Sequence, residues 1–255
     1  MGKNIKIILA SPPDTLKEAS HLGYDTSHMI YRVGQDRHLY RADLPLFLPG
    51  NILSVDDAGF QGDGPVSVLS SEIVKECTLN RYTGVVLDVR KENTAFFSKL
   101  TPLLLQSLEP FGIRLYVPEW LFERAKGVKV LISTFMSTGT LQGKLRRAIA
   151  AYGAENIAAD IPCSRMSYTL PVEKYPPKEL SLPELTALSR KYQTSSFFSK
   201  ELYAYYFTYT SGGKTEFVLY DNVGSIRRKL ALLQSFGIRE AFLLYPEVSD
   251  WLDDL

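Results

Sequence analysis

The stretch TGVVLDVR, residues 83–90, is an apolar run that ends in two charged residues, Asp88 and Arg90. It is typical of a short buried strand. The amphipathic segment NTAFFSKLTPLLLQSLEPFG (93–112) follows it and leads into a second strand, IRLYVPEW (113–120). A strand, a helix and a strand in this order predict one unit of a mainly parallel sheet with a crossover helix.

The same alternation extends over most of the chain. Further runs of strand type lie at 5–11, 28–40, 51–60, 128–139, 156–162 and 238–246, and further helical segments at 67–80, 140–153 and 222–237. About eight strands with intervening helices in roughly 250 residues are typical of a (β/α)8 TIM barrel. An open doubly wound sheet is the alternative, but no G-x-G-x-x-G or P-loop follows any strand.

One segment interrupts this rhythm near the C-terminal end. Residues 171–200 are richer in Pro, Ser and Lys and carry one helical segment at 182–193. Residues 203–221 then place alternating aromatic residues on both sides of SGGK, which predicts a hairpin. We attribute these aromatic residues to hairpin packing rather than to a ligand platform. We therefore predict a single domain over 1–255, a barrel with a small α+β hairpin insertion at about 171–220.

Composition excludes several classes of function. The net charge is +1, which gives no general attraction to nucleic acid, and no run approaches the roughly 20 apolar residues of a membrane helix. The first apolar run, of about five residues, is too short for a signal peptide, so a cytoplasmic location is the default. Cys77 and Cys163 lie far apart, and the three histidines fall in the first fifth of the chain, so we predict no metal site and no cofactor.

The last third of the chain is the most specific part. NIAADIPCSRMSYTLP (156–171) and the segment from the hairpin to LLYPE (243–247) resemble the end of the glycoside hydrolase family 18 barrel. The similarity is greatest to the spore-cortex type of N-acetylglucosaminidase, and GYDTSHMIYRVGQDRHLY (23–40) is similar to that family's second strand. This resemblance implies a TIM barrel, an O-glycosyl hydrolase ancestry, a glycan or peptidoglycan fragment as partner, and a spore-forming bacterium as source. It also implies spore association as a second possible location.

Within this resemblance, TGVVLDVR lies where the family carries D-G-x-x-x-D-x-E, so Arg90 replaces the glutamate that acts as general acid. A guanidinium has a pKa above about 12 and cannot donate a proton to a leaving group near neutral pH. Because side chains alternate along a strand, Val86, Asp88 and Arg90 are expected to share the face at the barrel's interior and mouth. The Arg90 cation is expected to favour the carboxylate form of Asp88.

Other strand ends depart from the family in the same direction. STFM (133–136) replaces M-T-Y-D and places Phe135 and Met136 at the tyrosine and aspartate positions. PCSRMSY (162–168) replaces P-L-Y-G-Y-D-W, and either Leu243 or Leu244 lies where a sugar-stacking tryptophan is expected. Coordinated loss of these groups predicts a degenerate site without classical hydrolysis.

Each candidate site residue has a structural and a functional interpretation. Asp88 and Arg90 form an ion pair at the mouth, or Arg90 binds an anion such as a carboxylate-bearing sugar. Asp56 and Asp57 face the mouth or cap a loop. Glu119 and Trp120 supply a replacement acid and a sugar platform, or a helix cap and a packed ring. The predicted ligand-binding set is Asp56, Asp57, Asp88, Arg90, Glu119, Trp120, Tyr168 and Tyr245.

Three functional hypotheses follow. The first is a degenerate family 18-like protein that binds an N-acetylglucosamine-containing glycan or an anionic ligand at the barrel mouth. The second is an active glycosidase on peptidoglycan- or chitin-type glycans, with Glu119 or the pair Asp56 and Asp57 as a relocated acid. The third is a scaffold or interaction protein with an occluded mouth.

Overall fold

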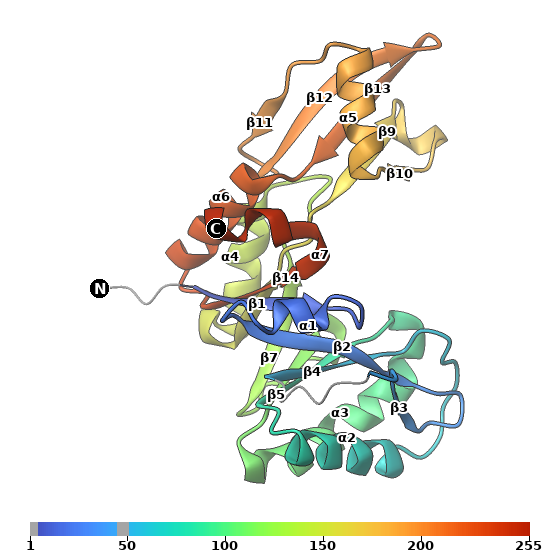
Figure 1. Cartoon of the computed structure of the whole chain (residues 1–255), viewed down its shortest axis with the longest axis vertical. Helices are drawn as coiled ribbons and strands as arrows, with labels where there is room; N and C mark the ends of the chain where they lie inside the picture. The colour runs from blue at the N-terminus through green and yellow to red at the C-terminus, as the bar shows by residue number, and fades with distance from the viewer. Residues whose placement is uncertain (1–4, 45–50) are drawn as a thin grey trace.

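The computed structural model describes residues 5–44 and 51–255. Within these ranges eight parallel strands close into a barrel, because the last of them pairs with the first (Figure 1). In order around the barrel they are β1 (Lys6–Ser11), β2 (Asp25–Val33), β4 (Ile52–Asp56), β5 (Gly84–Asp88), β6 (Arg114–Pro118), β7 (Val128–Ser133), β8 (Ile157–Asp160) and β14 (Glu240–Leu244). The predicted (β/α)8 barrel is confirmed.

The outer ring of helices is irregular. Long helices are α2 (Ser67–Leu79), α3 (Thr94–Leu108), α4 (Leu141–Tyr152) and α6 (Val223–Ser235), whereas α1 (Leu16–Ala19) and α7 (Tyr245–Val248) are each a single turn. Strand β3 (Leu39–Arg41) lies between β2 and β4 along the chain, and it pairs antiparallel with β2. The 3-10 turn η3 (Glu119–Leu121) lies between β6 and β7. The other 3-10 turns are η1 (Lys91–Asn93), η2 (Glu109–Phe111), η4 (Ala154–Asn156), η5 (Val172–Lys174) and η6 (Ser249–Asp254).

Local sequence explains where the helices begin and end. The Thr140 side chain accepts a hydrogen bond from the Gly143 amide at 3.1 Å, which caps the start of α4. Gly153, at φ +83°, ends that helix in a conformation that suits glycine. Helix α6 starts with a reciprocal capping box between Asn222 and Ser225.

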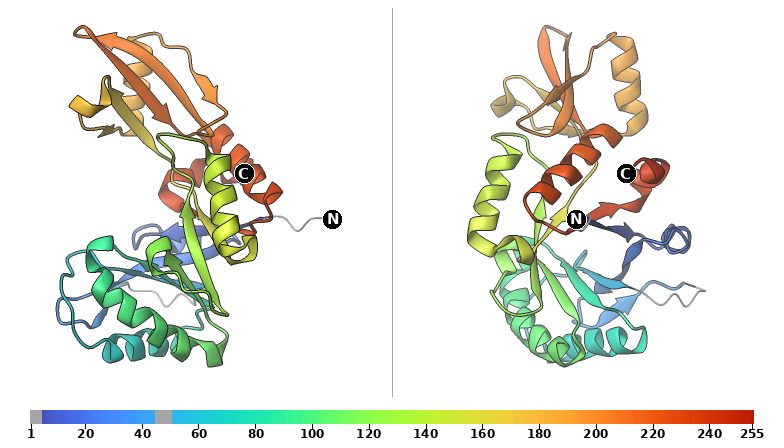
Figure 2. Two further views of the ribbon diagram at one scale, coloured as in Figure 1. Left: turned by 180° about the vertical axis from the view of Figure 1, so that it is seen from behind. Right: turned by 90° about the vertical axis from the view of Figure 1, so that its left-hand side faces the viewer.

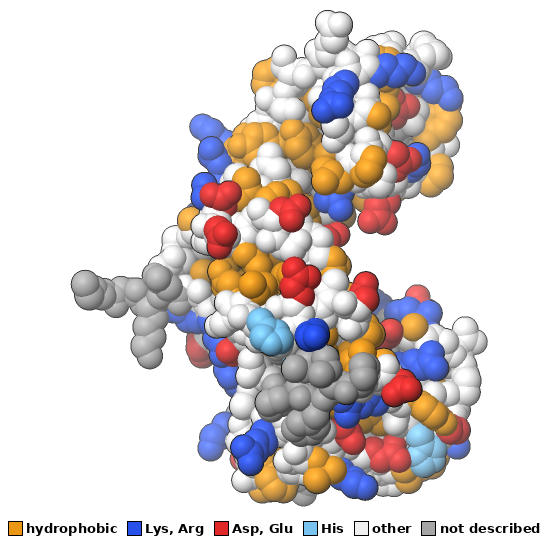
Figure 3. Space-filling model, in the orientation of Figure 1, with side chains coloured by type: hydrophobic (Ala, Val, Ile, Leu, Met, Phe, Trp, Pro, Cys, Tyr) orange, Lys and Arg blue, Asp and Glu red, His pale blue; other side chains and the backbone are white. Residues whose placement is uncertain are grey.

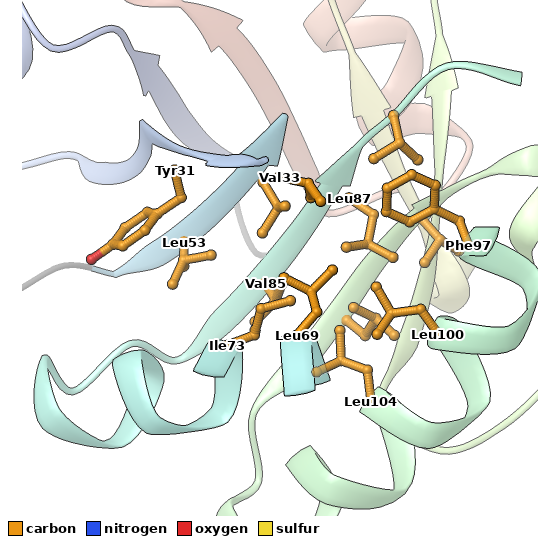
Figure 4. Close-up of a cluster of buried hydrophobic side chains, with 14 of the residues drawn as sticks. Tyr31, Val33, Leu53, Leu69, Ile73, Val85, Leu87, Phe97, Leu100 and Leu104 are labelled. Atoms are coloured by element: carbon orange, nitrogen blue, oxygen red, sulfur yellow. The ribbon is translucent and has the colours of Figure 1, made fainter. Parts of the chain in front are cut away.

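Most of the apolar core lies between the barrel and its helices. Helix α3 buries Phe97, Leu100 and Leu104 at helical spacing, and they pack with Val85 and Leu87 of β5 (Figure 4). Odd-numbered residues of β5 therefore face the helices. Even-numbered residues of the same strand face the barrel interior, which is the alternation that places Val86 and Asp88 inside.

The barrel interior has three levels. At the N-terminal ends of the strands, Glu240 is 6 % exposed and forms ion pairs with Arg114 at 2.6 Å and Lys129 at 3.0 Å. An apolar layer follows, made of Ile8, Ile52, Val86, Tyr116, Ala158 and Phe242. The third level, at the carboxyl ends of the strands, is a cavity. The interior of the barrel is therefore packed with side chains at its N-terminal end and in its middle, and it holds a cavity at its mouth.

A second sheet is inserted between β8 and α6 (Figure 2). Its antiparallel strands are β10 (Lys178–Glu179), β9 (Arg165–Thr169), β13 (Lys214–Tyr220), β12 (Ala204–Ser211) and β11 (Phe197–Ser199), with α5 (Leu182–Lys191) on one face. The sheet starts earlier than the expected boundary near residue 171, because β9 pairs with β13. Gly212 and Gly213 both have positive φ, as a type I′ hairpin turn requires.

Candidate functional site

A cavity of about 460 Å³ lies at the mouth of the barrel. Its described lining comes from the carboxyl ends of barrel strands and the residues that directly follow them: Ala10, Ser27, Met29, Ser54, Val86, Leu87, Asp88, Val89, Pro118, Leu131, Ser133, Asp160, Pro162, Phe242, Leu243, Leu244 and Glu247. The wall is mostly apolar. Figure 3 shows the surface hollowed between the inserted sheet and the barrel, with acidic side chains on both edges.

Three carboxyl groups, and no Lys or Arg of the described residues, line this cavity. Burial, and then the charge of Asp88, raises the pKa of Asp160 to about 6. Burial also raises the pKa of Asp88, and the charges of Asp56 and Asp57 add to the rise. The pKa of Glu247 is raised by burial as well, although the Cys163 amide donates a hydrogen bond to it at 3.1 Å. The surroundings of the mouth therefore raise the pKa of all three carboxyl groups.

The Asp88 result corrects a sequence-based expectation. We expected the Arg90 cation to favour the Asp88 carboxylate, and that prediction is wrong, since the pKa of Asp88 is raised rather than lowered. Strand β5 ends at Asp88, and Arg90 already has the extended conformation that precedes η1. Strand alternation therefore no longer fixes the direction of the Arg90 side chain.

Arg90 instead pairs with Asp57 of the neighbouring strand's loop. The Asp57 side chain is buried and accepts hydrogen bonds from the Arg90 amide at 3.0 Å and from Arg90 Nε at 3.2 Å. Asn93 donates a further hydrogen bond to Asp57 at 2.6 Å. Neither Arg90 nor Asp57 belongs to the described lining of the cavity. This pair ties the loop after β4 to the loop after β5.

Asp56 lies at the edge of the mouth rather than inside it. Its side chain is exposed and accepts a hydrogen bond from the Ala58 amide, as in a turn. It lines a second hollow of about 470 Å³ together with Asp88, Met29 and Ser54, three residues that also line the mouth cavity. The two hollows therefore meet at Asp88.

Glu119 and Trp120 lie outside the described lining of the mouth. Glu119 is exposed at the start of η3, and its side chain interacts with Tyr152. Trp120 packs against the core cluster beneath α2 and α3. The structure does not bring the carboxyl group of Glu119 together with Asp88 and Asp160.

The two predicted tyrosines lie in different places. Tyr168 is half-buried on β9 of the inserted sheet, where its hydroxyl group interacts with the side chain of Ser137. Tyr245 is 2 % exposed, packs in the core beneath α4 and α6, and interacts with Glu18. Tyr168 is near the mouth, whereas Tyr245 belongs to the core.

Sequence reasoning missed Asp160 and Glu247. Asp160 follows the apolar run IAA at the end of β8, just as Asp88 follows VVL at the end of β5. The rule that strand-end carboxyl groups meet at a barrel mouth would have found it. Glu247 follows β14 by three residues and reaches the mouth because α7 starts immediately after the strand.

Two of the strand ends that differ from the resembled family carry apolar side chains. Leu243 and Leu244 both line the cavity, and Met136 packs against the core instead. Within residues 5–44 and 51–255, no group of His, Cys, Asp and Glu side chains has the arrangement of a metal site. In the same ranges, none of the helices is long and apolar enough to span a membrane.

Solved structures with the same architecture include a spore cortex-lytic enzyme, SleL from Bacillus cereus. It is 14% identical, covers 96% of this chain and 71% of its own, and has a TM-score of 0.70. A chitinase from Chromobacterium violaceum is also 14% identical, covers 94% of this chain and 93% of its own, and has a TM-score of 0.70. A mutant class V chitinase from Nicotiana tobaccum in complex with NAG4 is 10% identical, covers 98% and 96% of the two chains, and has a TM-score of 0.67.

No protein-family model matches the sequence, and no curated protein matches it. The similarity is thus carried by the backbone rather than by sequence identity. The inserted α+β sheet, the barrel and their order along the chain agree with the resemblance inferred from residues 156–247. The chain therefore has the fold of the chitinase-like and spore cortex-lytic barrels.

Proposed function

We propose that this protein binds an N-acetylglucosamine-containing glycan at the barrel mouth and does not hydrolyse it by the mechanism of family 18. One observation carries the proposal: Arg90, at the position of the family's general acid, is held by Asp57 and leaves the mouth cavity without that acid. The cavity itself persists, and its volume of about 460 Å³ is within the range of small-ligand sites.

The mouth offers both kinds of contact that a sugar needs. Phe242, Leu243 and Leu131 provide apolar surface for the C–H faces of a sugar ring. Asp88, Ser54 and Ser133 provide hydrogen-bonding groups for hydroxyl and acetamido groups. The choice of glycan comes from the comparison structures, one of which is a complex with NAG4. We include peptidoglycan-type glycans and an association with spores in the proposal because one of the similar structures is a spore cortex-lytic enzyme.

Calorimetric titration with N-acetylglucosamine oligomers, together with an assay for new reducing ends, tests this proposal. We expect binding without release of reducing ends. Asp88→Asn should weaken binding about 10- to 100-fold, because a hydrogen bond to a charged group is worth about 1.5–3 kcal/mol. Glu109→Gln, which changes an exposed carboxyl group in η2, before the N-terminal end of β6 and thus at the other end of the barrel, is the matched control.

Each outcome of this experiment has one meaning. Turnover by the unmodified chain contradicts the non-hydrolytic part of the proposal. Turnover gained only in Arg90→Glu shows that the acid was the one missing group. Absence of both binding and turnover leaves the scaffold hypothesis.

Asp160 supports a second candidate function, hydrolysis with a relocated acid. Its carboxyl group lines the same cavity as Asp88, and its pKa of about 6 keeps a proton available in mildly acidic solution. In this scheme Asp160 donates its proton to the glycosidic oxygen as the bond to the anomeric carbon breaks and the oxygen of the substrate's own N-acetyl group bonds to that carbon. Water then attacks the same carbon, releases the N-acetyl oxygen and returns a proton to Asp160. Release of reducing ends that is abolished by Asp160→Asn and retained in Glu119→Gln would establish it. Loss in Glu119→Gln alone would return the role to Glu119.

A further inference from the structure

A hollow of about 490 Å³ lies on the outer surface of the barrel, and we call it the outer hollow. Helices α4 and α6 are neighbours there, below the inserted sheet (Figure 2). The hollow lies where they meet the turn at 200–203, which joins β11 to β12. Its described lining consists of Gln142, Phe198, Lys200, Tyr203, Arg228, Ala231, Leu232 and Ser235. None of these residues lines the mouth cavity, so the proposed glycan site does not account for the outer hollow.

The charged side chains that line the outer hollow are all cationic. Lys200 and Arg228 line it, whereas no Asp or Glu of the described residues does. Within residues 5–44 and 51–255, neither of these two side chains forms an ion pair. The carboxyl group of Glu201 lies outside the lining and accepts a hydrogen bond from Ser199 at 3.2 Å. The hollow therefore presents positive charge that attracts an anion.

Aromatic contacts hold two of the polar groups in place. The guanidinium carbon of Arg228 lies 4.5 Å from the centroid of the Phe198 ring, a contact that orients the planar group. The Tyr203 hydroxyl accepts a hydrogen bond from the Gln142 amide at 3.1 Å, which leaves the phenolic proton for another partner. Tyr203 also has φ +56°, which is unusual for a bulky residue. Backbone strain of this kind is concentrated at ligand sites.

The composition of the lining indicates the class of anion. Two cations match the charge of a phosphate monoester, which is about −1.5 to −2 at pH 7, better than the single charge of a carboxylate. The planar fork of Arg228 suits two phosphate oxygens, and Lys200 adds a point charge. Phe198 and Leu232 provide apolar surface beside these cations. The volume is within the range of small-ligand sites, so the hollow has room for a carbon skeleton as well as a phosphate group.

We propose that the outer hollow binds a small organic phosphate monoester. Arg228 and Lys200 bind its phosphate group, and its carbon skeleton lies against Phe198 and Leu232. This inference goes beyond the proposed function, because it concerns a different ligand and a different set of residues. Either one can fail while the other stands.

Isothermal titration with phenyl phosphate at low ionic strength tests the inference, with benzoate as a singly charged ligand that carries the same ring. We expect phenyl phosphate to bind, and to bind more tightly than benzoate. Arg228→Gln and Lys200→Gln should each weaken this binding about ten-fold, the lower end of the range for a hydrogen bond to a charged group, because both side chains are exposed. Arg227→Gln is the matched control. It removes the same charge from the next position of α6, where Arg227 pairs with Asp254 at 3.1 Å outside the hollow.

A second variant adds a charge instead of removing one. Ala231 is exposed on α6, one turn after Arg228, so Ala231→Glu should fold normally and place a carboxylate beside the guanidinium. It should abolish phenyl phosphate binding. In the unmodified chain the affinity should decrease with added salt, and also as the pH falls below about 6, where the phosphate group takes up its second proton.

The outcomes are distinct. Loss of affinity in Arg228→Gln, Lys200→Gln and Ala231→Glu, but not in Arg227→Gln, supports the proposal. Absence of phenyl phosphate binding to the unmodified chain at millimolar concentration overturns it. An equal loss in Arg227→Gln overturns it as well, because general charge rather than the hollow would then hold the ligand. Benzoate that binds as tightly as phenyl phosphate contradicts the phosphate class.

Discussion

Replacing Asp160 by Asn should stabilise the protein at neutral pH and leave its stability unchanged near pH 4. Burial, and then the charge of Asp88, raises the pKa of Asp160 from 3.8 to about 6. Between these two values the folded protein holds a proton that the unfolded chain releases. The contribution of Asp160 to stability is therefore complete below about pH 4 and is lost as the pH rises through about 6.

The magnitude follows from the two pKa values. They differ by about two pH units, and each unit corresponds to about 1.4 kcal/mol. Ionised Asp160 therefore costs the folded state about 3 kcal/mol above pH 7. An Asn side chain keeps nearly the same shape and carries no charge, so the variant should recover most of this free energy. The cost of a buried carboxyl group at the mouth is consistent with a functional site.

Urea unfolding of the wild type and Asp160→Asn between pH 4 and 8 measures this effect. His28 titrates in the same window with the opposite sign, so the informative quantity is the difference between variant and wild type at each pH. Asp14→Asn, at an exposed position, is the matched control for the loss of one carboxyl group. A difference that stays flat from pH 4 to 8, or a variant less stable than the wild type at pH 7.5, would refute the reasoning.

Three further predictions concern buried polar groups. Lys229→Met should destabilise the protein by about 3–5 kcal/mol in urea unfolding, because Lys229 and Asp221 are almost fully buried and pair at 2.7 Å. Burial, and then the charge of Arg41, lowers the pKa of His28 to about 4, so the contribution of His28 to stability should fall by about 3 kcal/mol as the pH drops from 6.5 to 4. In the same assay, the difference in stability between the wild type and His28→Asn should change by this amount over that pH range. Arg90→Ala should cost about 1–3 kcal/mol by thermal or urea unfolding, since it leaves Asp57 with fewer donors, and should leave glycan affinity unchanged by calorimetry.

The barrel was predictable because its signals are local. An apolar run such as 84–87 buries both faces of a strand, and the helical spacing of residues 96, 100 and 104 marks the helix that covers it. The hairpin was predictable from Gly212 and Gly213, since glycine readily adopts the positive φ of the turn. The sequence did not reveal that a single 3-10 turn, η3, replaces the helix between β6 and β7. A short segment after a strand can form either a helix or a single turn.

The site was only partly predictable. Asp88 was found through its place at a strand end, and the same rule applied to Asp160 would have found a second lining carboxyl group. The position of Arg90 was not predictable, because its backbone leaves the strand after Asp88 and its guanidinium finds a partner 33 residues earlier in the sequence. Glu119 met the same strand-end criterion as Asp160 and yet lies outside the described lining of the cavity.

The sequence by itself therefore determined the elements and their order, because both depend on residue type and on spacing along the chain. Only the tertiary structure decided which charged groups face the cavity and which pair with each other. That choice depends on burial and on distances between residues far apart in the sequence. It replaced an expected Asp88–Arg90 pair with an Arg90–Asp57 pair, and it left Asp88, Asp160 and Glu247 in a mouth whose low polarity raises their pKa values.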